Sequence, residues 1–337
     1  MACMADMRLL APWLLAFGLA PPAHAGMQLN AQSSGVGVRL RGIAAVDGSV
    51  AWASGQKGMV LRTVDGGAQW KAVPVPDATA LDFRDIEAFD ARRALVLSIG
   101  PGDVSRVYRT TDGGATWQRV LQNTDPQGFF DCMAFEGERG WLLGDPVDGR
   151  YQLYATQDGG AHWAPDRNGP PALKDEAAFA ASGTCIARLH GAIAVTSGGA
   201  ASRLHLRRDG TRAWRALDTG MERGKAAAGA FSVAPWANGA MVVGGDYTAE
   251  QAPGNAARLA TRRASALQFL PAPRGYRSGV ACTRRLCIAA GPSGVDAWDG
   301  KRWTSISDAS FDAVSIRGNT AWLSGAKGAL AKIRLLP

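Results

Sequence analysis

The chain has few of the residues from which metal sites and nucleophilic active sites are built. Its 337 residues include 5 Cys, 4 His and 5 Tyr, and no two cysteines form a CxxC pair. Such scattered ligands are poor material for a zinc site. Glycine-rich phosphate loops and a dinucleotide-binding fingerprint are also missing, so an oxidoreductase would have no cofactor site. We therefore expect no cofactor and no metal.

Long apolar runs are also missing, and the one short run lies in a segment typical of a secretory signal. Arg8 precedes a twelve-residue apolar stretch, Leu9–Ala20, and Ala23-His24-Ala25 then forms an A-x-A cleavage site. Spanning a bilayer takes about 20 apolar residues, so this stretch is too short for a membrane anchor. We expect cleavage after Ala25 and an exported, periplasmic protein that does not span the membrane.

Four cysteines remain after that cleavage, in an oxidising compartment. Cys282 and Cys287 lie five residues apart between two short apolar runs, where a hairpin can place them side by side. They are the candidate disulfide. Cys132 and Cys185 are a weaker pair, and either one can instead be a small buried residue.

One octapeptide recurs through the chain. Residues 63–70 (TVDGGAQW) return as 110–117 (TTDGGATW) and 156–163 (TQDGGAHW), at intervals of 47 and 46 residues, and 207–214 is a worn copy. In such a segment the Asp accepts backbone N–H bonds across a turn, Gly tolerates positive φ, and Trp covers an apolar layer. We therefore predict structural rather than catalytic roles for Asp65, Trp70, Asp112, Trp117, Asp158, Trp163, Asp209 and Trp214.

A second element completes the repeat. Small-residue apolar strands that end near glycine occur seven times, at 51–55, 95–100, 140–145, 192–198, 240–246, 286–291 and 321–325. Each follows a short inner strand and precedes the strand that leads into the turn, so one unit has four strands. Such units, repeated about every 45 residues, are typical of propeller blades.

The predicted fold is therefore all-β: a seven-bladed propeller that forms one domain over residues 26–337. Six or eight blades stay open, because residues 220–275 match the repeat poorly. The last unit, 310–337, supplies only three strands. We expect residues 27–32 to add the fourth and so close the ring without an open sheet edge.

Several segments resemble a known family. RTVDGGAQW (62–70), DFRDIEAFD (82–90), ASGQKG (53–58) and LSGAKG (323–328) are similar to the photosystem II stability and assembly factor family, whose repeats are of the Asp-box (BNR) type. The resemblance covers essentially the whole mature chain. It implies a seven-bladed propeller exported to the lumen or periplasm, which binds a newly made membrane-protein subunit without catalysis. It also implies an arginine-rich binding surface, but it does not identify the arginines.

Loops that join the second and third strands of a blade, and loops between blades, meet on one face of a propeller, opposite the Asp-box turns. Binding residues concentrate in loops. The longest of these, residues 244–257, holds two acids and a tyrosine. The candidates on this face are Lys57, Asp103, Arg106, Asp145, Asp148, Arg150, Arg203, Asp246, Tyr247, Arg277 and Lys327.

Positive charge is concentrated in one part of the chain. The net charge is +8, yet residues 188–302 alone carry 17 Arg and Lys against 7 Asp and Glu. The planar guanidinium group of arginine suits carboxylates, which favours a protein partner, either a membrane-protein segment or an acidic tail, that docks on this basic side. The alternative is that these arginines only keep the rim solvated. Nucleic acid is an unsuitable partner, because aromatic residues do not interleave with these arginines. The basic-side candidates are Arg207, Arg208, Arg212, Arg215, Arg258, Arg262 and Arg263.

The alternative function is carbohydrate-active, either lectin-like or hydrolytic, because Asp-boxes also occur in sialidases. Sialidase chemistry needs three arginines on the substrate carboxylate, a tyrosine activated by a glutamate, and an acidic aspartate. The Arg39-Leu-Arg41 segment is a weak approach to the first arginine motif. Glycoside hydrolysis in general needs two opposed carboxyl groups, which Asp145 or Asp148 could form with Asp246 or Glu250. Nothing in their spacing requires such a pair, so we predict a non-catalytic protein and assign no catalytic residue.

Overall fold

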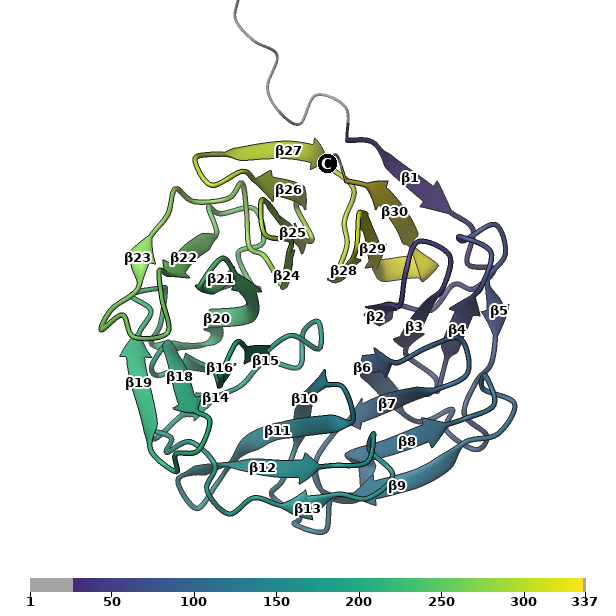
Figure 1. Cartoon of the computed structure of the whole chain (residues 1–337), viewed down its shortest axis with the longest axis horizontal. Helices are drawn as coiled ribbons and strands as arrows, with labels where there is room; N and C mark the ends of the chain where they lie inside the picture. Colours follow the sequence, from purple (N-terminus) through teal and green to yellow (C-terminus); the bar gives the residue numbers. More distant parts are fainter. Residues whose placement is uncertain (1–26, 336–337) are drawn as a thin grey trace, which may run out of the picture.

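Seven antiparallel β-sheets form a ring around a central axis in the computed structural model, which describes residues 27–335 (Figure 1). Along the chain, blades 1 to 6 run from an inner strand at the axis to an outer strand at the rim, whereas blade 7 takes its outer strand from the start of the described chain. The predicted seven-bladed propeller is confirmed. No helix in this range is long and apolar enough to cross a membrane. The signal segment, residues 1–25, lies outside the described residues.

Blades 1 to 3 have four strands each and carry the three well-preserved Asp-box turns before their outer strands. Blade 1 consists of β2 (Leu40–Ala45), β3 (Ala51–Gly55), β4 (Val60–Thr63) and β5 (Lys71–Ala72). Blade 2 consists of β6 (Asp82–Ala88), β7 (Ala94–Ile99), β8 (Arg106–Thr110) and β9 (Gln118–Gln122), with the short 3-10 helix η1 (Gly102–Val104) before β8. Blade 3 consists of β10 (Phe130–Glu136), β11 (Arg139–Val147), β12 (Arg150–Thr156) and β13 (Ala164–Pro165).

Blades 4 and 6 also have four strands, although their turns have diverged from the Asp-box pattern. Blade 4 consists of β15 (Ile186–Leu189), β16 (Ala192–Thr196), β18 (Arg203–Arg208) and β19 (Trp214–Asp218). Blade 6 consists of β24 (Gly279–Cys282), β25 (Cys287–Gly291), β26 (Gly294–Trp298) and β27 (Trp303–Ser307).

Blade 5 is the stretch that matches the repeat poorly, and its sheet has six strands. Its own strands are β20 (Lys225–Trp236), β21 (Gly239–Asp246), β22 (Asn255–Leu259) and β23 (Gln268–Phe269). Two short strands from earlier in the chain, β14 (Glu176–Ala177) and β17 (Gly198–Gly199), extend it along the inner edge of β20. This approach is so close that a Cβ on Gly229 would overlap Gly198, which explains why small residues occupy the contact.

Blade 7 is built from both ends of the described chain. β28 (Ala313–Arg317), β29 (Thr320–Ser324) and β30 (Leu330–Arg334) form its inner three strands, with the 3-10 helix η2 (Ala326–Gly328) before β30. The outer strand is β1 (Leu29–Gln32), which pairs with β30 from Leu29 opposite Ile333 to Gln32 opposite Leu330 (Figure 1). The predicted closure of the ring by strands from both ends is confirmed.

Tryptophans join neighbouring blades. Trp52 of β3 is fully buried, donates its indole N–H to the Asp90 carbonyl of blade 2 at 3.0 Å, and lies edge-on to Trp117 at 6.4 Å. Trp322 of β29 makes the same contacts between blades 7 and 1. It lies edge-on to Trp70, with ring centroids 5.7 Å apart, and donates its indole N–H to the Asp47 carbonyl. Trp70 and Trp117, the tryptophans of the first two Asp-boxes, therefore pack against the second strand of the preceding blade.

Candidate functional site

The three preserved Asp-box aspartates make their contacts inside their own turns. Asp65 accepts a 2.9 Å hydrogen bond from the Thr63 hydroxyl and a 3.0 Å bond from the Gln69 N–H. Asp112 and Asp158 make the corresponding bonds, and a threonine bond lowers the pKa of Asp112 to about 2. In the worn copy, Asp209 pairs with Arg188 instead. These contacts give the aspartates a role in holding the turns.

A pocket of about 400 Å³ lies at the axis, where the inner strands of the blades begin. We call it the axial pocket. Four of its side chains occupy equivalent places: Arg41 on β2, Arg84 on β6, Asp131 on β10 and Phe231 on β20. Each is the residue skipped in the pairing of its inner strand with the second strand, a β-bulge. A bulge redirects the extra side chain, and here all four line the same pocket.

Charged side chains line much of the axial pocket. Arg39 forms a two-pronged ion pair with Asp312, at 2.7 and 2.6 Å, and Arg84 contacts Asp82 at 2.9 Å. Arg41 is different: among the described residues it makes no ion pair and no hydrogen bond, and its Nε atom is buried without a partner. Burial, followed by repulsion from Arg84, lowers the pKa of Arg41 to about 10.

Two carboxyl groups face this positive charge. Asp131 is 1% exposed and its Oδ2 atom has no hydrogen-bond partner, while Asp145 accepts a 2.9 Å bond from the Ala178 N–H. Burial raises the pKa of Asp145 to about 6, and burial together with the neighbouring Asp145 raises that of Asp131 well above its ordinary value. The folded protein therefore holds the proton of both groups more tightly than the unfolded chain does.

An aromatic cluster forms another wall. Phe179 and Phe231 stack with their ring centroids 3.7 Å apart, and Tyr276 lies edge-on to Phe231 at 4.7 Å. Tyr247, which is 48% exposed, approaches the same ring at 6.3 Å. This wall offers a flat apolar surface with its rim in solvent.

The floor of the axial pocket is the segment 178–184, which other blades hold in place. Arg84 of blade 2 donates to the Ala180 carbonyl at 3.3 Å, and the Ser182 hydroxyl donates to the Ser278 carbonyl at 2.7 Å. Below the segment lies a further cavity of about 280 Å³, lined by Asp85 and Glu87 among others. Burial raises the pKa of both of these carboxyl groups as well.

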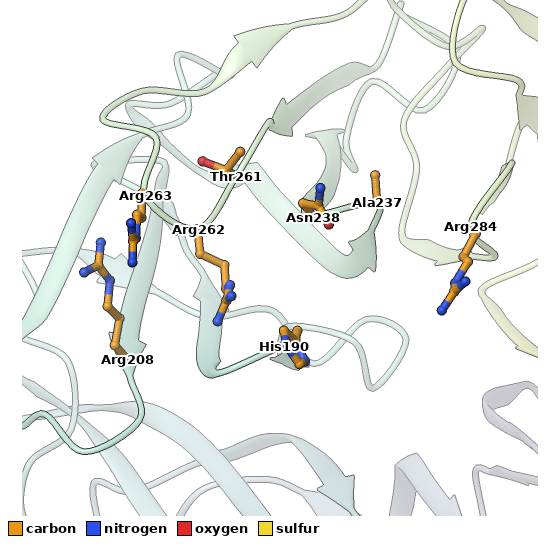
Figure 2. A pocket seen from close by; sticks show the side chains of 8 residues that line it. All are labelled: His190, Arg208, Ala237, Asn238, Thr261, Arg262, Arg263 and Arg284. Atoms are coloured by element: carbon orange, nitrogen blue, oxygen red, sulfur yellow. The ribbon is translucent and has the colours of Figure 1, made fainter.

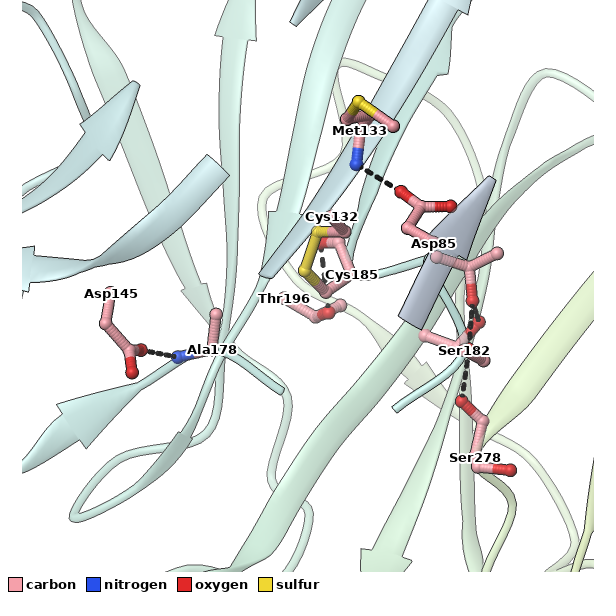
Figure 3. The surroundings of a disulfide bond; sticks show 11 residues. Asp85, Cys132, Met133, Asp145, Ala178, Ser182, Cys185, Thr196 and Ser278 are labelled. Atoms are coloured by element: carbon pink, nitrogen blue, oxygen red, sulfur yellow. Dashed lines mark hydrogen bonds between the residues drawn. A yellow bond between two sulfur atoms is a disulfide. The ribbon is translucent and has the colours of Figure 1, made fainter. Parts of the chain in front are cut away.

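Two disulfides are present in the described chain. Cys132 bonds to Cys185, directly after the floor segment (Figure 3). Cys282 bonds to Cys287 across the paired strands β24 and β25, where the two cysteines are direct partners in the ladder. The sequence favoured the Cys282–Cys287 pair over the Cys132–Cys185 pair. The Cys132–Cys185 bond joins β10 of blade 3 to a residue 53 positions later, directly before β15 of blade 4.

A larger pocket, of about 930 Å³, lies between blades 4, 5 and 6, at turns on the same side of the ring as the Asp-box turns. Figure 2 shows the side chains that line it. We call it the arginine pocket. Its lining residues come from the turns that end β15, β18, β20, β22 and β24: His190, Arg208, Ala237, Asn238, Thr261, Arg262, Arg263 and Arg284. Within residues 27–335, the guanidinium groups of its four arginines make no hydrogen bond or ion pair. The pocket is therefore a concentration of unpaired positive charge.

The structure separates the predicted basic-side residues into two groups. Arg208, Arg262 and Arg263 line the arginine pocket. The other four have partners or lie elsewhere: Arg207 with Asp166 at 2.7 Å, Arg215 with the Arg262 carbonyl at 3.0 Å, Arg258 with Gln268 at 2.7 Å, and Arg212 in a smaller neighbouring hollow. Sequence reasoning missed His190 and Arg284, although both stand in first-to-second strand turns of the basic stretch.

Of the predicted binding-face residues, Asp145 and Tyr247 line the axial pocket. Others are engaged elsewhere: Arg106 with Asp103 at 3.4 Å, Arg150 with the Gly169 carbonyl at 3.0 Å, Arg203 with Glu176 at 2.8 Å, and Asp246 with Lys225 at 3.1 Å. Lys57, Asp148 and Lys327 are exposed at turn positions with positive φ. Asp148 and Asp246 do not line the axial pocket, so Asp145 and Glu250 are the only members of the proposed hydrolytic pairs that share it.

Arg277 requires a correction. The sequence placed it on the binding face, but its side chain is fully buried, because the guanidinium pairs with Asp296 and donates to the Ser293 hydroxyl at 2.6 Å. It is a structural residue of blade 6.

The sequence did not reveal Arg41, Arg84, Asp131 and Phe231 as pocket residues. Their only sequence signal is a shared place at the start of each inner strand. No group of three or more His, Cys, Asp or Glu residues in the described range is placed to hold a metal ion.

Replacing Asp145 with asparagine is expected to stabilise the protein above about pH 7 and to have little effect below about pH 4. Burial outweighs the Ala178 bond and raises the pKa of Asp145 from 3.8 to about 6. The folded state thus holds the proton more tightly than the unfolded chain, so the stability contribution is complete below the unfolded pKa and is lost as the pH rises through the folded one. Two pKa units correspond to about 3 kcal/mol. Asparagine keeps an oxygen acceptor for the Ala178 N–H.

Urea unfolding of Asp145→Asn and the parent at several pH values measures this difference. The exposed Asp148→Asn variant, three residues away, is the matched control. An Asp145→Asn variant whose stability follows the same pH curve as the parent contradicts the raised pKa of the Asp145 carboxyl.

Comparison with solved structures places this fold beside known binding and assembly propellers. YCF48 bound to a D1 peptide superimposes with a TM-score of 0.64 and 16% identity, covering 92% of this chain and 97% of that one. YCF48 from Cyanidioschyzon merolae superimposes with a TM-score of 0.64 and 18% identity, covering 91% of this chain and 99% of that one. BamB from Moraxella catarrhalis has a TM-score of 0.52 and 14% identity, covering 88% of this chain and 83% of that one. No protein-family model and no curated protein sequence matches the chain.

YCF48 is a photosystem II assembly factor and a seven-bladed propeller, so the family resemblance found in the sequence is matched at the level of the fold. The identities are low, and the similarity establishes the fold alone.

Proposed function

We propose that this protein is an exported, non-catalytic propeller that binds an acidic segment of a partner protein in the arginine pocket. The observation that carries the proposal is the set of four unpaired guanidinium groups of Arg208, Arg262, Arg263 and Arg284 around one pocket of about 930 Å³. Like charges brought together repel one another, and an anionic partner relieves that repulsion. Arginine is well suited to this task because its planar fork binds a carboxylate through two hydrogen bonds.

The comparisons support a protein as the partner. A propeller of the same fold, YCF48, has been solved with a D1 peptide bound. The arginine pocket is open and lies in turns from three blades, which suits an extended chain. Export is supported by two disulfides, which form and persist in oxidising compartments.

The hydrolytic alternative finds less support. Tyr276 lines the axial pocket near Glu250, but burial raises its pKa, whereas a nucleophilic tyrosine needs its pKa lowered. Asp246 is engaged by Lys225 outside that pocket. We therefore assign no catalytic residue.

An acidic peptide should bind the parent protein and lose at least about tenfold in affinity when Arg208, Arg262 and Arg263 are all changed to glutamine. Fluorescence anisotropy with a labelled peptide of alternating Glu and Gly measures binding, and a Gln-Gly peptide of equal length is the uncharged probe. Protein recovered from a periplasmic extract also tests export, because its intact mass should correspond to a chain that starts at Gly26.

The matched control removes the same number of charges elsewhere. Arg92, Arg119 and Arg167 are exposed on blades 2 and 3, and their change to glutamine should leave the affinity within about twofold. Equal weakening by both triple variants would mean that net charge alone attracts the peptide. Equal binding of the Glu and Gln peptides would refute an acidic partner.

A further inference from the structure

We propose that the axial pocket is a second binding site, separate from the arginine pocket, for a small carboxylate with a flat, largely apolar body, such as a hydroxybenzoate. It opens where the inner strands begin, and its volume of about 400 Å³ falls within the usual range for small-molecule sites, about 300–1,000 Å³.

The positive side of the pocket is incomplete. Arg39 has Asp312 and Arg84 has Asp82, but Arg41 has no ion pair or hydrogen bond among the described residues, and its Nε is buried. Burying a charge without a partner is costly, commonly by several kcal/mol. A ligand carboxylate beside Arg41 would supply the missing partner.

The acidic side of the axial pocket, at Asp131, suits a polar group on the ligand rather than a cation. Asp131 lines this pocket, is almost fully buried, and has an Oδ2 atom without a hydrogen-bond partner. Burial and the neighbouring Asp145 raise its pKa well above the ordinary value, which favours the neutral form that can donate a hydrogen bond. A neutral acid does not repel an anionic ligand, and it can bind a hydroxyl or carbonyl oxygen opposite the carboxylate.

The aromatic wall and the alanines of the floor segment determine the shape of the ligand. Phe179 and Tyr247 are the more exposed rings of this wall, and both contact the buried ring of Phe231. Ala178, Ala180 and Ala181 leave space beside them. A planar ring fits such a surface through offset or edge-on contacts, which contribute about 0.5–1.5 kcal/mol per aromatic pair beyond burial. The combination of a partly buried, unpaired arginine, a largely neutral acid and an aromatic wall is what favours an aromatic carboxylate.

Isothermal titration calorimetry with 4-hydroxybenzoate at pH 6 tests the site, with uncharged 4-hydroxybenzamide as the paired probe. We expect saturable binding of the acid and at least about tenfold weaker binding of the amide. Arg41→Gln should weaken the acid by a similar factor and abolish the preference over the amide. Ala226→Trp, at an exposed position on the rim of the pocket, should block both probes while Arg41 stays in place.

Two controls separate this site from the arginine pocket and from misfolding. Arg262→Gln, on the other side of the ring, should leave 4-hydroxybenzoate binding within about twofold, so a failure of either proposal does not imply failure of the other. Urea unfolding midpoints check that each variant is folded. The proposal is wrong if the parent shows no saturable binding, if acid and amide bind equally, or if both pocket variants bind like the parent. Binding of N-acetylneuraminate without binding of the aromatic acid would also overturn it, in favour of an acidic sugar.

Discussion

Replacing Arg277 with alanine is expected to lower the free energy of unfolding by about 3–5 kcal/mol. Both partners of the Arg277–Asp296 ion pair are buried, with side chains 0% and 1% exposed. Removing the guanidinium leaves the Asp296 carboxylate in a low-dielectric interior with only the Arg274 contact, at 2.9 Å. The Ser293 hydroxyl and the Tyr276 carbonyl lose a partner at the same time. Urea unfolding followed by tryptophan fluorescence measures the loss.

A double variant distinguishes an unpaired charge from simple loss of packing. Arg277→Met with Asp296→Asn keeps side-chain volume and removes both charges, so it should recover most of the stability lost in Arg277→Ala. Buried ion pairs can often be replaced by neutral residues of similar size without large cost. If the double variant is as unstable as Arg277→Ala, the loss comes from packing and the electrostatic explanation is wrong.

Trp52→Ala should cost about 3–5 kcal/mol, the usual range when a buried aromatic side chain is removed. Trp52 is fully buried between blades 1 and 2, lies edge-on to Trp117, and donates to the Asp90 carbonyl. Its removal therefore opens a cavity at a blade interface and leaves the part-buried Asp90 carbonyl without its donor. Calorimetric or urea unfolding measures the change.

The control for this prediction is Phe269→Ala. Phe269 lies on the outer strand β23 with 56% of its surface exposed, so its removal should change stability by about 0.5 kcal/mol or less. A Trp52→Ala variant that unfolds at the same urea concentration as Phe269→Ala contradicts the role of the tryptophans in joining blades.

The fold could be predicted because its signals are local and repeated. The DGG turns at Asp65, Asp112 and Asp158 contain both the bond acceptor and the glycines that the turn needs, so the period of the blades is visible without any tertiary contact. Ring closure also followed from strand counting. Blade 5 was hard to recognise because its outer turn, at 260–267, lacks the DGG residues and its sheet borrows β14 and β17.

The axial pocket could not be predicted in the same way, because it depends on register. Arg41, Arg84, Asp131 and Phe231 differ in chemistry, and they share a site only because each is the extra residue of a bulge. A shift of one position in pairing would turn these side chains away from the axis. Sequence reasoning placed binding residues in loops and thereby overlooked the first residues of the inner strands.

For the arginines, composition located the basic region but did not distinguish the arginines that have an ion-pair partner from those that have none. Arg207 and Arg208 are adjacent in the sequence, yet Arg207 is paired with Asp166 while Arg208 lines the arginine pocket. Neighbours on a strand point to opposite faces, and only the position of Asp166, about 40 residues earlier, decides which arginine is neutralised.

The pairing of β1 with β30 also sets the order in which the molecule can be completed. During synthesis, Leu29–Gln32 is among the first described segments to be made, and its partner Leu330–Arg334 is the last strand. The earlier blades can form their internal hairpins as they emerge, but blade 7 must wait until β30 has been made. A nascent chain that does not yet include β30 therefore retains an unpaired strand edge at β1, a target for chaperones or for aggregation, and the pairing with β30 removes that edge.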